Sequence, residues 1–71
     1  MDVQHLVAMA NDIAAFFDGD TDKAAATEGV RSHIAKFWEK RMRREIIAHV
    51  EAGGAGLAPT ASAAIKLLPR P

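Results

Sequence analysis

The absence of cysteine constrains this short chain more than any other feature of its sequence. With 71 residues the chain can form one domain at most, and the core of such a domain is small. Domains of this size usually depend on disulfides, a metal, very regular helix packing or a partner. Without cysteine, disulfides, thiolate metal sites and thiol catalysis are all excluded.

Alanine is the commonest residue and occupies fifteen positions. It has the highest helix propensity of any residue, but its small side chain buries little apolar area. Tyrosine is absent, and the large apolar residues recur mostly at helical spacing. We therefore predict a single all-α domain over residues 1–71. It should contain three or four short helices around a thin core that favours association with a partner.

The first predicted helix covers residues 2–17, where apolar residues recur at i, i+3 and i+4. Asp2 can cap its start, and Gly19 suits its end. A second helix is predicted from about residue 22 to residue 38. Its expected N-cap is Asp20 or Thr21.

A break is predicted near residues 39–41, because two apolar stripes do not align there. The first stripe consists of Val30, Ile34 and Phe37. At about 100° per residue, the second lies on the other side of the same helix and consists of Met42, Ile46 and Val50. One continuous helix would have to be buried on both sides, which is the alternative to a break. The third helix should end at Gly53 and Gly54, and Pro59 should open a short last helix.

Several short motifs imitate functional sites but lack essential residues. The segment DGDTD (18–22) resembles the start of a calcium loop, but Lys23 replaces the glycine and Gly29 the last carboxylate that the loop requires. The three histidines include no i, i+4 pair, and the GGAG segment (53–56) follows a helix rather than a strand. We predict no catalytic residue and no metal site in this chain.

Residues 33–45, HIAKFWEKRMRRE, place two aromatic residues directly before a cluster of cations. Up to four of these cations can share a helical surface at i, i+3 spacing. The net charge of the chain is zero, but residues 1–29 are acidic and residues 30–71 are basic. A solvated basic face, a protein-docking surface and a nucleic-acid site are the alternatives. The neutral chain and its few aromatic residues argue against nucleic acid.

Three segments in this order resemble the small delta subunit of the NAD-dependent, molybdenum-containing formate dehydrogenases of bacteria. They are LVAMANDIAAFF (6–17), HIAKFWEKRMR (33–43) and GGAGLAP (53–59). The chain departs from the family pattern at Glu39 and Lys40, where an Asp-Pro pair is usual. It departs again at Ala58, where an acidic helix cap is usual.

The resemblance implies a non-catalytic accessory subunit that supports assembly, stability or cofactor insertion of a large catalytic subunit. The complex would carry bis-molybdopterin guanine dinucleotide, iron–sulfur clusters and FMN on that subunit and on NAD-reducing partner subunits, and none on this chain. A dissociable maturation chaperone and a generic nucleic-acid-binding helical module are the alternatives. A cytoplasmic location is expected, since no signal peptide or membrane span is visible.

The central segment supplies the residues expected to form the interface. Phe37 and Trp38 are predicted to anchor either the core of the chain or its contact with the large subunit. Arg41 and Arg43 are candidates for carboxylates of that subunit or for the phosphates of an incoming cofactor. The full predicted set is His33, Phe37, Trp38, Arg41, Met42 and Arg43. Asn11 is expected either to hydrogen-bond across the interface or to face water.

Overall fold

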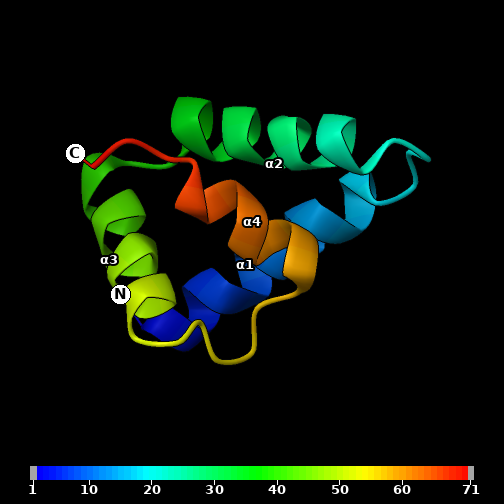
Figure 1. Ribbon diagram of the computed structural model, residues 1–71. Helices are drawn as coiled ribbons and strands as arrows, with labels where there is room; N and C mark the ends of the chain where they lie inside the picture. The colour runs from blue at the N-terminus through cyan, green and yellow to red at the C-terminus, as the bar shows by residue number, and fades with distance from the viewer. Residues whose placement is uncertain (1, 71) are drawn as a thin grey trace.

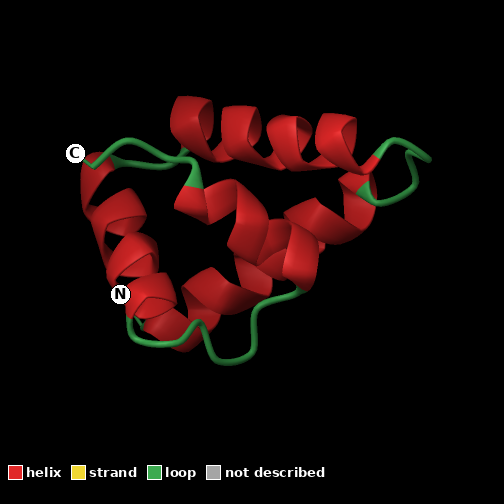
Figure 2. Cartoon of the chain, in the orientation of Figure 1, coloured by secondary structure: helices red, strands yellow, loops and turns green. Residues whose placement is uncertain are grey.

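The computed structural model describes residues 2–70 and consists of four α-helices, which confirms the predicted all-α fold (Figures 1 and 2). The helices are α1 (Val3–Phe17), α2 (Lys23–Phe37), α3 (Lys40–Glu51) and α4 (Pro59–Lys66). Met1 and Pro71 lie outside the described residues. Helices α2 and α3 are joined by a very short connection, whereas a longer loop leads from α3 to α4 (Figure 2).

Helix α4 is central to the packing. It contacts each of the other three helices, and Figure 1 shows it between α2 and α1, with α3 at one end of the molecule. The largest fully buried side chains come from all four helices and are Leu6, Val30, Ile34, Ile46 and Ile65. Buried alanines fill the remaining space and let the helix backbones approach closely: Ala10, Ala14, Ala26, Ala61 and Ala64.

The predicted break between the second and third helices is confirmed, and it falls at Trp38 and Glu39. Both residues have an extended backbone (φ −88°, ψ 136° and φ −64°, ψ 155°), and α3 begins at Lys40. This turn separates the two neighbouring aromatic side chains, because Trp38 is 5% exposed and Phe37 is 72% exposed. The prediction that Phe37 continues the buried stripe of α2 is wrong. The stripe ends at Ile34, and Trp38 takes the next position in the core.

Aspartate side chains cap the first two helices. Asp2 Oδ1 accepts a hydrogen bond from the amide of Gln4 at 3.1 Å, as predicted. Asp22 caps α2 by accepting from two amides of its first turn, so the prediction of Asp20 or Thr21 as the N-cap is wrong. Asp20 instead accepts from the amide of Asp22 at 2.9 Å and thereby holds the cap in position.

Glycines end α3 as predicted. Gly53 and Gly54 have φ values of 121° and 66°, which side chains other than that of glycine disfavour, and the Gly54 amide donates to the carbonyl of His49 at 2.9 Å. Pro59 is the first residue of α4, also as predicted. The predicted glycine end of α1 is wrong, because α1 is closed by its own last turn and Gly19 does not have a positive φ.

Gly29 lies where α2 passes the aromatic ring of Phe17 on α1. A methyl group on Gly29 would come within 2.4 Å of Cδ1 and 2.5 Å of Cε1 of that ring. Both distances are far shorter than van der Waals contact. Gly29 therefore permits the close approach of α1 and α2, although glycine weakens a helix interior.

Replacing Gly29 by alanine is expected to lower the free energy of unfolding by about 1 kcal/mol, because overpacking against Phe17 outweighs the gain in helix propensity. Thermal unfolding followed by circular dichroism measures the change. In a Phe17→Ala background the steric conflict is absent, so the same Gly29→Ala substitution is expected to stabilise the chain. A stabilising effect in the unmodified chain would contradict the close helix contact.

Candidate docking surfaces

The six residues predicted to form an interface are divided between the core and the surface. Phe37 and Arg41 are exposed, His33 and Arg43 are half-buried, Met42 packs partly against the core, and Trp38 is a core residue. Burial of the indole also removes it as a platform on which nucleic-acid bases could stack. The basic–aromatic segment therefore has two roles, one inside the fold and one on its surface.

Arg43 contributes to the junction between α2 and α3. Its Nη1 donates to the carbonyl of Ala35 at 3.4 Å, and this carbonyl lies in the last turn of α2, where helix carbonyls lack partners within the helix. Its Nε is buried and has no hydrogen-bond partner among residues 2–70. The Arg43 side chain thus makes a contact within the chain, whereas the neighbouring Arg41 is exposed.

Lys40, Arg41 and Arg44 form an exposed cluster that we call the α3 basic surface. They are neighbours at i, i+3 and i+4 on the helix, and within residues 2–70 none of them takes part in an ion pair. Lys40 and Arg41 lie in the first turn of α3, where the helix dipole disfavours cations, and Glu39 provides no side-chain cap. Because α3 gains nothing from these charges, they are available to a partner.

Arg31 on α2 differs from the α3 basic surface because its charge is already paired. Its Nη2 and Nε donate to the carboxylate of Glu28, both at 2.6 Å. The hydrogen bond from Arg31 lowers the pKa of the Glu28 carboxyl group and raises the pKa of Arg31 itself. As a unit, this pair adds no net charge to the surface of α2.

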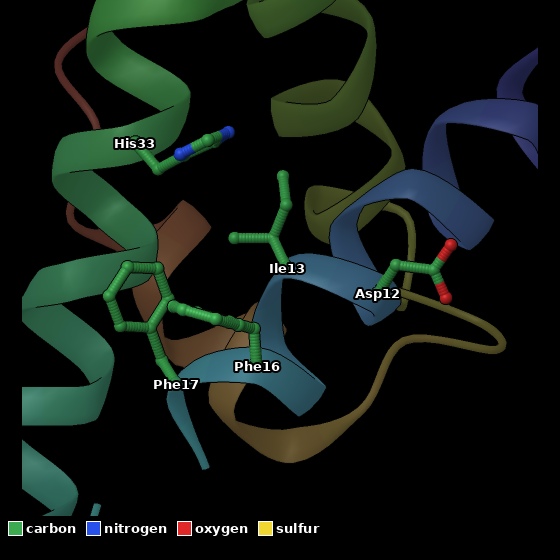
Figure 3. Close-up of a pocket in the computed structure, with 5 residues that line it drawn as sticks. All are labelled: Asp12, Ile13, Phe16, Phe17 and His33. Carbon is green, nitrogen blue, oxygen red and sulfur yellow. The ribbon is translucent and has the colours of Figure 1, made fainter. Parts of the chain in front are cut away.

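The second surface is an apolar groove between α1 and α2, which we call the α1–α2 groove. Its cavity volume is about 360 Å³, and its lining residues are Asp12, Ile13, Phe16, Phe17 and His33. Figure 3 shows Ile13, Phe17 and His33 pointing into the space between the two helices, while the carboxylate of Asp12 points away from His33 at the rim. Asp12 and His33 therefore do not form an acid–base pair.

Exposed aromatic side chains extend this groove at both ends. Phe16 is 79% exposed and packs edge-on against Phe17, with ring centroids 5.2 Å apart. Phe37 lies one turn beyond His33, with centroids 4.8 Å apart. The sequence prediction included His33 and Phe37 but missed Phe16. The sequence does contain a signal for Phe16 as a surface residue, because this phenylalanine lies outside the apolar stripe of its own helix.

Asn11 lies beside the loop that connects α3 to α4 and bonds to its backbone at two points. Its Nδ2 donates to the carbonyl of Gly56 at 2.9 Å, and its Oδ1 accepts from the amide of Ala58 at 2.8 Å. The expectation that Asn11 bonds across an interface or faces water is wrong, because both halves of the amide are used within the chain. Ala58 is the N-cap of α4 and cannot cap it with its own side chain, so Asn11 supports the start of this helix.

The acidic loop between α1 and α2 serves the fold. Asp18 accepts a hydrogen bond from the hydroxyl of Thr60 at 2.7 Å and lies 3.8 Å from Lys23, while Asp20 and Asp22 bond to backbone amides. No group of three or more potential metal ligands occurs among residues 2–70.

Within residues 2–70, no helix combines the length and apolar character that a membrane crossing requires.

Comparison with known proteins yields one family. The model of the family described as the NADH-dependent formate dehydrogenase delta subunit FdsD matches residues 5–65. No curated protein matches the chain, and no solved structure does. The matched range contains the α1–α2 groove, the α3 basic surface and the loop that Asn11 holds.

Proposed function

The chain belongs to the family of NADH-dependent formate dehydrogenase delta subunits, and we propose that it is a non-catalytic accessory subunit that binds the large catalytic subunit of such an enzyme. In this role it would support the assembly, stability or cofactor loading of the complex. The family match covers residues 5–65 and so includes all four helices almost completely.

The α3 basic surface is the observation that carries the proposal. The three exposed cations have no ion pair within the described residues, and two of them lie in the first turn of α3, where the helix dipole disfavours positive charge. Arginine forks bind carboxylates in a planar, two-point geometry. We therefore propose that Lys40, Arg41 and Arg44 bind carboxylates of the large subunit, while Arg43 mainly supports the α2–α3 junction.

The redox chemistry of the complex is assigned to the partner subunits in this proposal. The chain contains no cysteine, and cysteine thiolates are the usual ligands of iron–sulfur clusters. The molybdopterin cofactor, the clusters and FMN would then be held by the large subunit and its NAD-reducing partners. We further propose that the complex is cytoplasmic.

Reversing the charges of Arg41 and Arg44 to glutamate is expected to weaken binding to the purified large subunit about tenfold, because like charges then face each other. Isothermal titration calorimetry with the full chain measures the dissociation constant. Glutamate at position 41, in the first turn of α3, is favourable for the helix dipole, and both positions are exposed, so the double variant is expected to stay folded.

A matched control changes the net charge equally at other sites. Lys23 and Lys66 are exposed and lie outside α3, and their double replacement by glutamate is expected to leave binding within about twofold. An equal loss of affinity in both double variants would show that net charge, rather than the α3 basic surface, controls association. If the unmodified chain and both double variants all fail to bind the large subunit, the proposed function itself is contradicted.

Stoichiometry separates a permanent subunit from a maturation chaperone. If the chain is a subunit, the purified active enzyme contains it in a fixed ratio to the large subunit. If it is a chaperone, it binds the immature large subunit and is absent from the finished enzyme. Quantitative mass spectrometry of both forms, purified at native expression levels, distinguishes these outcomes.

A further inference from the structure

We propose that the α1–α2 groove binds an amphipathic helix of the large subunit, whose apolar ridge contacts Phe16 and Phe37 and whose basic side chain pairs with Asp12. This inference rests on the proposed function, because it takes the large subunit as the partner. It adds a second docking surface that is separate from the α3 basic surface and uses apolar contacts instead of charge.

The exposed aromatic residues are the first observation behind this proposal. Phe16, Phe37 and Leu67 are the large apolar residues that are most exposed, at 79%, 72% and 60%. Both phenylalanines belong to the same surface, and Leu67 does not line the groove. Phenylalanine is enriched at protein interfaces, where its rigid ring buries a large area with little loss of conformational entropy.

Continuity of the surface is the second observation. Edge contact joins Phe16 to Phe17, Ile13 and Phe17 line the cavity beside His33, and His33 contacts Phe37. The surface therefore runs from the end of α1 to the end of α2, and the imidazole of His33 connects the cavity to Phe37. Two packed helices offer a groove of this kind to the side-chain ridge of a third helix, which presents anchors at i, i+3, i+4 and i+7.

Charge identifies the chemistry of the occupant. Asp12 is the carboxylate at the rim of the groove, and within residues 2–70 it has no ion pair. Helix α1 contains no lysine or arginine, and neither residue type lines the groove. In a symmetric dimer through this groove, His33 is the base that the lining of the second groove would bring to Asp12. A helix of the large subunit that carries a lysine or arginine beside its apolar ridge complements this carboxylate, and we take such a helix as the occupant.

Substituting serine for Phe16 and Phe37 together tests the apolar contact. We expect the dissociation constant for the purified large subunit to rise about 30-fold, because a few large side chains usually contribute most of the binding energy of an interface. Both side chains are exposed, so the melting temperature should change little. The matched control is Leu67→Ser, which removes an exposed apolar side chain outside the groove and should leave binding unchanged.

Charge reversal and cross-linking test the identity of the occupant. Asp12→Lys is expected to weaken binding about threefold to tenfold by opposing the basic side chain of the partner helix. A photoreactive benzoylphenylalanine at position 16 is expected to cross-link to one helix of the large subunit, which mass spectrometry of the cross-linked peptides identifies. Cross-links to a second copy of the chain, or to a strand or loop of the large subunit, would overturn the assignment.

The outcomes separate this inference from the proposed function. If the unmodified chain binds the large subunit and the groove variants bind equally well, the groove assignment is wrong and the proposed function stands. If the unmodified chain binds no subunit of the enzyme, both are overturned. If only the groove variants lose binding while the α3 variants keep it, the groove is the main docking site.

Discussion

Replacing Trp38 by alanine is expected to unfold most of the isolated chain at room temperature. Trp38 is 5% exposed and belongs to the core cluster that all four helices build. Removing a buried tryptophan costs about 3–5 kcal/mol, through lost apolar burial and through the cavity that remains. A core this small supplies a total stability of about the same size. Loss of helical circular dichroism at 25 °C is the expected measurement.

The adjacent aromatic residue provides the matched control. Phe37 is 72% exposed, so Phe37→Ala should change the free energy of unfolding by no more than about 0.5 kcal/mol. Its unfolding can be followed by the fluorescence of Trp38, the single tryptophan of the chain. Similar losses for the two substitutions would contradict the placement of one ring inside and its neighbour outside.

Replacing Asn11 by alanine is expected to lower the free energy of unfolding by about 1–3 kcal/mol. The substitution leaves the part-buried Ala58 amide without its acceptor, which costs about 1–3 kcal/mol, whereas the exposed Gly56 carbonyl can bond to water instead. Loss of the bond to Ala58 also weakens the start of α4, which has no side-chain cap of its own. Chemical denaturation followed by circular dichroism measures the change.

Two further variants test the mechanism of Asn11. Asn11→Asp keeps an acceptor for the amide of Ala58 but places a carboxylate oxygen against the Gly56 carbonyl, so its stability should lie between those of the alanine variant and the unmodified chain. Asp12→Ala changes the next residue of α1, which is exposed and has no ion pair in the described chain, and should have little effect. Equal effects of Asn11→Ala and Asp12→Ala would show that Asn11 does not hold the loop.

Trp38 and Asn11 also show which features of the fold could not be predicted from the sequence. The apolar stripes before and after Trp38 point in different directions on one helical wheel, and this difference correctly predicted a helix break. The angle between the two stripes follows from helix geometry alone. It did not predict that Trp38 would enter the core and Phe37 would leave it. That choice depends on the direction in which the chain turns and on the space that the other helices leave. Asn11 likewise meets partners 45 and 47 positions away, and a helical wheel contains no information about them.

The sequence by itself determined the all-α fold, the positions of the four helices, the glycine end of α3 and the family resemblance. These features depend on interactions between residues that are close in the chain, namely backbone hydrogen bonds, caps and helical periodicity. Only the tertiary structure decided which aromatic ring is buried, why Gly29 must lack a side chain, and that Phe16, His33 and Phe37 share one surface. The physical reason is that burial and proximity arise from packing between helices, which local sequence patterns constrain but do not specify.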